Sequence, residues 1–190
     1  TEDVLGLVIG TILGTVTAVQ LALFRTAERL ILPILVFTQA VPVFALAPLL
    51  TLWFGYGIGS KIVMTVLIIF FPVTSAFHDG LTRTDNRFHD LAHAMGARKV
   101  RFMWHVQIPS ALPDLGTGLK LAAVYAPIGA VIGEWVGASK GLGYLMLLAN
   151  GRAKIDLMFA SLIVLACLTV LLHIVVGRLA LWLTRYAQGK

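Results

Sequence analysis

Charged side chains are scarce in this sequence of 190 residues. Aspartate, glutamate, lysine and arginine together make up 13% of the chain, whereas a domain in water usually carries about 25%. Hydrophobic residues account for 58%. A chain so poor in charge cannot cover an ordinary water-exposed surface, and we therefore expect it to lie largely within a lipid bilayer.

Cysteine is almost absent. Cys167 is the only one and lies in an apolar run, which excludes a disulfide framework and a cysteine-based metal site. The sequence also lacks a phosphate-binding loop ending in Gly-Lys-Ser or Gly-Lys-Thr, so any nucleotide must be bound by another polypeptide. The first apolar run follows Glu2 and Asp3 rather than basic residues, which argues against a signal peptide.

Five long apolar runs dominate what is present. In lipid the backbone must satisfy its own hydrogen bonds, which favours helices, and the runs lack the alternation of barrel strands. We predict an all-α polytopic membrane protein with a single domain over residues 1–190. The five expected transmembrane helices are residues 4–24, 30–54, 62–77, 115–136 and 157–176.

The basic residues are unevenly divided between the two expected sides of the membrane. Eleven fall on one side: Arg25, Arg29, Arg83, Arg87, Arg98, Lys99, Arg101, Lys120, Arg178, Arg185 and Lys190. The other side has four: Lys61, Lys140, Arg152 and Lys154. The positive-inside rule places the larger group and the C-terminus in the cytoplasm. The net charge of +6 is then explained by cytoplasmic loops, without nucleic-acid binding.

The longest loop, residues 79–114, has a helical pattern. Four apolar residues recur at the spacing of one helical face: Phe88, Leu91, Ala92 and Met95. Thr84 or Asp85 can cap the start of this helix, and Gly96 stands where a left-handed C-terminal cap is expected. An amphipathic helix at a membrane surface needs a partner for its apolar face, and helix-in-groove docking would provide one.

A second short helical run follows in the same loop. Val100, Met103 and Trp104 again have helical spacing, and we expect Pro109 and Pro113 to end this run. Asp114 or Thr117 would then cap the fourth span.

This loop resembles the EAA loop of ATP-binding-cassette importer permeases. Asp90-Leu-Ala92 is followed by three residues, Gly96, nine residues and Val106-x-Ile-Pro109, which matches the family spacing at every step. The sequence departs from the family motif at Asp90, Leu91, Val106 and Ile108, and Leu91, which replaces an alanine, is the one replacement that is not conservative. Residues 42–61 and 133–145 are similar to the nitrate, sulfonate and taurine permease branch. Residues 150–160 look most like permeases for thiamine-precursor pyrimidines.

The resemblance implies a type I importer permease fold in a bacterial inner membrane. The loop helix would couple the chain to an ATPase subunit dimer that binds ATP and magnesium, so this chain itself would hold no cofactor and would not be an enzyme. A second permease subunit, expected to be a second copy, and an extracytoplasmic solute-binding protein would complete the assembly. The residues expected to carry coupling are Asp90, Ala92, Gly96, Phe88, Leu91, Met95, Phe102 and Pro109.

Glu134 and Pro127 are candidates for the translocation path. Acids within membranes are often functional, and a proline can kink a helix beside a cavity. A secondary transporter or channel is the alternative from another class. It would need ionisable residues near mid-membrane, where Glu134 is the only serious candidate, and it would not account for the patterned loop.

Two motifs suggest enzyme chemistry. Gly137-Ala-Ser139-Lys-Gly141 matches a serine nucleophile elbow, and His173 would be its base in an intramembrane protease. The expected topology, however, places His173 about 24 Å deeper in the membrane than Ser139, and the two must be in hydrogen-bond contact. His89-Asp90-Leu-Ala-His93 mimics a zinc site, but without glutamate and without a third ligand we expect no metal.

A glycine stripe marks the first span. Gly6, Gly10 and Gly14 lie on roughly one helical face, which permits close helix contact. Packing within one subunit and a dimer seam both satisfy this pattern.

Overall fold

The computed structural model describes residues 2–187, apart from the side chains of residues 2, 3, 86 and 89, and this part of the chain contains helices and no strand. The elements, in chain order, are α1 (Glu2–Leu23), α2 (Arg25–Ala40), α3 (Val43–Phe54), α4 (Ile58–Thr82), α5 (Asn86–Ala94), α6 (Lys99–Phe102), the π-helical turn η1 (Met103–Gln107), α7 (Ile108–Gly137), α8 (Leu142–Gly151) and α9 (Ile155–Ala187). The predicted all-α class is confirmed.

Within residues 2–187, four single helical stretches are long and apolar enough to cross a bilayer, and one bent pair of helices meets the same criterion when taken together. The four are Val4–Leu23, Ile58–Thr82, Lys99–Gly137 and Ile155–Ala187. The span expected at residues 30–54 is instead the pair α2 and α3, bent by 98°. The bend lies at Val41-Pro42, where Val41 has an extended backbone (φ −84°, ψ 119°). A proline disfavours the helical conformation of the residue before it, which explains the break.

The helices that border the long loop extend further than expected. α4 continues to Thr82, and the stretch from Lys99 runs as one helix to Gly137. The prediction that Pro109 and Pro113 end a short helix is therefore wrong. Pro109 cannot donate a helical hydrogen bond to the carbonyl of His105, and the wide turn η1 that contains His105 accommodates this loss.

The same continuous helix corrects the expected start of the fourth span. Asp114 and Thr117 lie inside α7 and do not cap it. Asp114 instead packs against Gly80 of α4. The approach is so close that a Cβ added to this glycine would lie 2.7 Å from the Asp114 side chain. Arg83 lies 3.8 Å from the Asp114 carboxylate, so the end of α4 and the beginning of α7 are held together.

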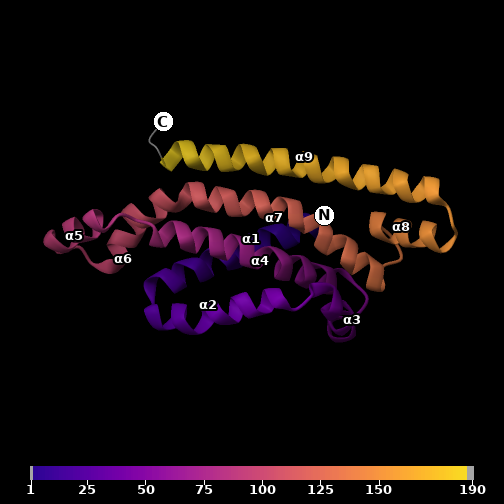
Figure 1. Cartoon of the computed structure of the whole chain (residues 1–190), viewed down its shortest axis with the longest axis horizontal. Coiled ribbons are helices and arrows are strands. Elements are labelled where there is room, and N and C mark those ends of the chain that lie inside the picture. The colour runs from indigo at the N-terminus through magenta and orange to yellow at the C-terminus, as the bar shows by residue number, and fades with distance from the viewer. Residues whose placement is uncertain (1, 188–190) are drawn as a thin grey trace.

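α4 and α7 pack along each other at the centre of the molecule, with α1 against α4 and α9 against α7 (Figure 1). The buried core lies between these helices and includes Ile69, Val73, Phe77, Leu119 and Ala122. α2 runs beside this bundle and contacts it sparsely.

The glycine stripe of α1 packs within the chain. Each glycine faces a different α4 side chain: Gly6 meets Thr65, Gly10 meets Ile69 and Gly14 meets Val73. A Cβ at Gly10 would lie 2.6 Å from the Ile69 side chain, a distance that real contacts do not show. Of the two interpretations of the stripe, the structure supports packing within one subunit.

The two ends of the bundle differ in charge. The α1–α2 turn, the α4–α6 segment and the C-terminal end of α9 lie at one end, called the α5 end below (Figure 1). The described basic residues of the larger group lie in these elements, except for Lys120 within α7. α3 and α8 lie at the other end, called the α8 end, with the smaller basic group.

Candidate functional site

The loop helix α5 begins and ends as the sequence predicts. The Asp85 side chain accepts a hydrogen bond from the backbone N–H of Arg87 over 2.9 Å, which caps the helix start. At the other end the N–H of Ala97 donates to the carbonyl of Ala92 over 2.9 Å. Gly96 between them has φ +67°, a left-handed conformation that glycine adopts without a steric penalty.

The apolar face of α5 is open to its surroundings. Phe88, Leu91 and Met95 are 53%, 57% and 76% exposed. Together with the segment that follows the helix they border a cavity of about 320 Å³, called the coupling cavity below. Its lining residues are Phe88, Leu91, Ala92, Met95, Gly96, Ala97, Arg101, Phe102, His105 and Val106. A large apolar surface beside a hollow marks an interaction site.

The predicted coupling residues occupy different places around this cavity. Six of them line it: Phe88, Leu91, Ala92, Met95, Gly96 and Phe102. Phe102 is only 6% exposed, so its ring forms an inner wall and not part of the outer apolar face. Asp90 is exposed on α5 outside the lining, and Pro109 lies further along, at the beginning of α7.

Among the residues that the structure describes, three polar contacts tie this loop to the bundle, and no pattern in the sequence predicted them. The Lys99 ammonium donates to the carbonyl of Leu23 at the end of α1. The buried side-chain amide of Gln107 donates to the carbonyl of Leu81 in α4 over 3.1 Å. The Arg83–Asp114 pair links α4 to α7. Long-range partners of backbone carbonyls leave no periodic signal in a sequence.

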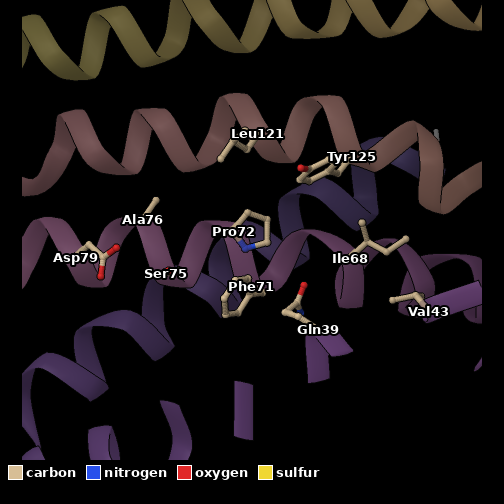
Figure 2. Close-up of a pocket in the computed structure, with 10 residues that line it drawn as sticks. All are labelled: Gln39, Val43, Ile68, Phe71, Pro72, Ser75, Ala76, Asp79, Leu121 and Tyr125. Atoms are coloured by element: carbon tan, nitrogen blue, oxygen red, sulfur yellow. The ribbon is translucent and has the colours of Figure 1, made fainter. Parts of the chain in front are cut away.

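A second, larger cavity lies beside α4 (Figure 2). It measures about 580 Å³ and is called the α4 cavity below. Its lining residues come from α2, α3, α4 and α7: Gln39, Val43, Ile68, Phe71, Pro72, Ser75, Ala76, Asp79, Leu121 and Tyr125. No single segment of the sequence predicts this cavity, although Pro72 and Asp79 on one helical face were a possible signal.

Glu134 has a clear structural partner. Its carboxylate accepts hydrogen bonds from the N–H groups of Gly143 (2.6 Å) and Tyr144 (3.4 Å) at the beginning of α8. This is the electropositive end of a helix, which favours a carboxylate. Glu134 and Pro127 together line a cavity of about 210 Å³ between α1, α7, α8 and α9, and neither lines the α4 cavity.

The rival protease site is not assembled. His173 Nδ1 lies 3.4 Å from the carbonyl of Lys120. Lys120 precedes the end of α7 at Gly137 by about 25 Å of helix, and Ser139 lies beyond that end. A nucleophile and its base must be in contact.

Residues 6–187 match the family described as binding-protein-dependent transport system inner membrane component. The chain belongs to this family of transporter permeases. The predicted resemblance to importer permeases is confirmed.

Two curated relatives of this permease cover much of the chain. A probable ABC transporter permease protein of Haemophilus influenzae is 52% identical over 172 residues, which is 90% of this chain and 70% of the relative. The formylaminopyrimidine transport permease protein ThiX of Halalkalibacterium halodurans is 44% identical over 140 residues, 74% of this chain and 56% of the relative. The chain thus spans between about half and seven-tenths of the lengths of these relatives.

A solved structure shares the fold. An inward-facing form of the MetNI methionine ABC transporter superimposes with a TM-score of 0.80 and 20% identity, covering 97% of this chain and 94% of that one. The predicted permease fold is confirmed.

Proposed function

We propose that this permease is the membrane-spanning subunit of an ATP-driven importer and that two copies form the transport unit. ATP and Mg²⁺ are bound by a separate pair of ATPase subunits, and an extracytoplasmic binding protein delivers the solute. The observation that carries this proposal is the exposed apolar face of α5 beside the coupling cavity. Its support is the family membership and the match to the EAA loop.

The α5 end faces the cytoplasm in this proposal, and the C-terminal end of α9 lies on the same side. The larger group of basic residues supports this orientation through the positive-inside rule. The α8 end then faces outward, where the binding protein would approach. The membrane is the inner membrane of a bacterium.

Coupling works through a rigid helix seated in a groove of the ATPase. Phe88, Leu91 and Met95 supply the apolar contacts of helix-in-groove docking. When the ATPase subunits close on ATP, α5 moves with them. The Lys99–Leu23 and Gln107–Leu81 contacts transmit this movement to α1 and α4, because packed helices shift between discrete arrangements.

The proposed solute is a thiamine-precursor pyrimidine. The relative ThiX is named for formylaminopyrimidine transport, and residues 150–160 resemble permeases of that class. The sulfonate, taurine and nitrate class is the alternative that the loop and flanking motifs leave open.

The first experiment asks whether an ATPase subunit binds at α5. The permease is co-expressed with the ATPase encoded beside it and purified in detergent through a tag on the permease. The wild-type permease and a Trp53→Asp variant, altered at the α8 end, should retain the ATPase. A Met95→Asp variant should lose it, because a charge cannot be buried in an apolar groove. A permease that never retains an ATPase would favour the secondary transporter or channel.

A further inference from the structure

The coupling mechanism leaves the α4 cavity without a role. One face of α4 packs against the glycine stripe of α1 through Thr65, Ile69 and Val73. The cavity face carries Ile68, Phe71, Pro72, Ser75, Ala76 and Asp79, which recur at helical spacing (Figure 2). A volume of about 580 Å³ lies within the range of small-molecule sites.

The polar groups of this cavity are mainly hydrogen-bond acceptors. Asp79 supplies a carboxylate, and Ser75 and Tyr125 supply hydroxyls that can accept as well as donate. Pro72 has no N–H, so the carbonyl of Ile68 lacks its usual helical donor. Gln39 adds one amide. Such a set suits a ligand that carries N–H donors.

The charge of the cavity is negative. The described lining residues include an acid, Asp79, but neither lysine nor arginine. Behind it, the buried His78 lies 3.9 Å from the Asp79 carboxylate and 3.5 Å from that of Glu28. Even with His78 protonated, these three groups carry a net negative charge. An anionic solute would be repelled here, and like-charge repulsion is an effective means of discrimination.

The remaining walls are apolar and partly aromatic. Phe71 on α4 and Tyr125 on α7 both border the cavity, with Val43, Leu121 and Ala76 completing its apolar surface (Figure 2). Aromatic side chains offer flat surfaces on which a planar ring can stack.

We propose that the α4 cavity is a solute-contact site on the transport path, and that it accepts a neutral or cationic amino-substituted heteroaromatic ring, such as an aminopyrimidine, and rejects sulfonates and nitrate. Asp79 accepts from the amino group of the ring at one end of the cavity, and Phe71 and Tyr125, which lie further along the path, contact the ring as it moves through. This inference rests on the proposed import function and names the chemistry that the permease itself selects.

The test measures protection of one thiol in the cavity. A Ser75→Cys variant is built in a Cys167→Ser background, so that the introduced thiol is the only one among residues 1–190, and labelling is read on the permease band after the subunits are separated. The permease–ATPase complex is purified without binding protein and labelled with a maleimide. Hydroxymethylaminopyrimidine should slow the labelling in a concentration-dependent manner, and methanesulfonate at equal concentration should not.

Matched acid variants show whether Asp79 is responsible. Asp79→Asn should raise the half-protecting concentration about tenfold, the size expected for one lost charge-assisted hydrogen bond. Asp156→Asn removes an exposed acid outside the cavity and should leave that concentration unchanged. Equal protection by methanesulfonate, no effect of Asp79→Asn, or a thiol that stays unreactive without solute because a second copy covers it would each overturn the inference.

The same preparation separates the two proposals. If the ATPase co-purifies and its activity rises with solute-loaded binding protein, but the thiol is not protected, only the solute-contact site is wrong. If no ATPase associates with the permease, the import function itself fails.

Discussion

The carboxylate of Glu134 lies 2.6 Å from the backbone nitrogen of Gly143, at the first turn of α8. Two glycines make this approach possible. A Cβ on Gly141 would lie 2.1 Å from the carboxyl group of Glu134, and one on Gly143 would lie 3.0 Å from its oxygen. Glu134 thereby holds α8 against the end of α7.

We expect Gly141→Ala to detach α8 from Glu134. The new methyl group would displace the carboxylate, and φ +124° is unfavourable for alanine. Loss of a charged hydrogen bond to a helix N-terminus should cost about 1.5–3 kcal/mol. The measurement is the thermal midpoint of the purified permease. Gly151→Ala, where a Cβ meets nothing within 4 Å, is the matched control. Equal midpoints for both variants would contradict this role of Glu134.

The C-terminal end of α5 should require glycine at position 96 because of its left-handed backbone, and not because a side chain would lack room there. The φ of Gly96 is +67°, and a Cβ at this position would meet nothing within 4 Å, so strain is the only cost of a side chain. Gly96→Ala should destabilise the end of α5 by about 1–2 kcal/mol, and Gly96→Asn by less, because asparagine tolerates this region. Amide hydrogen exchange of α5 would report both changes. Equal exchange in the alanine and asparagine variants would argue against backbone strain.

The contact between Gly10 and Ile69 predicts a suppressor. Gly10→Ala would place a methyl group 2.6 Å from the Ile69 side chain and force α1 away from α4, at a cost of about 1–3 kcal/mol. Ile69→Ala should restore part of this stability when combined with Gly10→Ala, although it is destabilising alone. Thermal midpoints of the two single variants and the double variant measure the coupling. Simple additivity would contradict direct contact.

Gln107 should connect the loop to α4. Gln107→Leu keeps a similar size but removes the buried donor to the Leu81 carbonyl. We expect ATP hydrolysis to continue while solute uptake per ATP falls, because the loop would move without α4. Gln20→Leu, at an exposed glutamine of α1 that lines neither the coupling cavity nor the α4 cavity, controls for loss of an amide elsewhere. Solute uptake and ATP hydrolysis measured in the same proteoliposomes give the number of solutes moved per ATP. An unchanged number for Gln107→Leu would show that the Gln107–Leu81 hydrogen bond does not couple the loop to α4.

The parts of the fold that depend on local patterns could be predicted from the sequence. The helical spacing from Phe88 to Met95 predicted α5, and Gly96 predicted its left-handed end. Uninterrupted apolar runs predicted the long spans, because backbone hydrogen bonding in lipid leaves few alternatives to a helix.

The errors arose where tertiary packing overrides a local rule. Pro42 breaks the second span, whereas Pro109 and Pro113 lie within the continuous helix α7, where the wide turn η1 accommodates the missing donor of Pro109. The partners of Glu134 were not foreseen, since they lie beyond a turn whose geometry depends on Gly141, and its place on the translocation path stays a prediction. The α4 cavity is formed by residues from four helices, and no single segment indicates it.

The most direct test of the central claim is the coupling of ATP hydrolysis to solute uptake in reconstituted permease carrying Ala92→Asp. Ala92 lines the coupling cavity, whereas Ala94 on the same helix does not, so Ala94→Asp adds the same charge outside the docking face. Both variants should insert into the membrane. We predict that Ala92→Asp abolishes solute-stimulated hydrolysis and uptake and that Ala94→Asp retains both. Normal coupling with Ala92→Asp would contradict docking of the ATPase at α5.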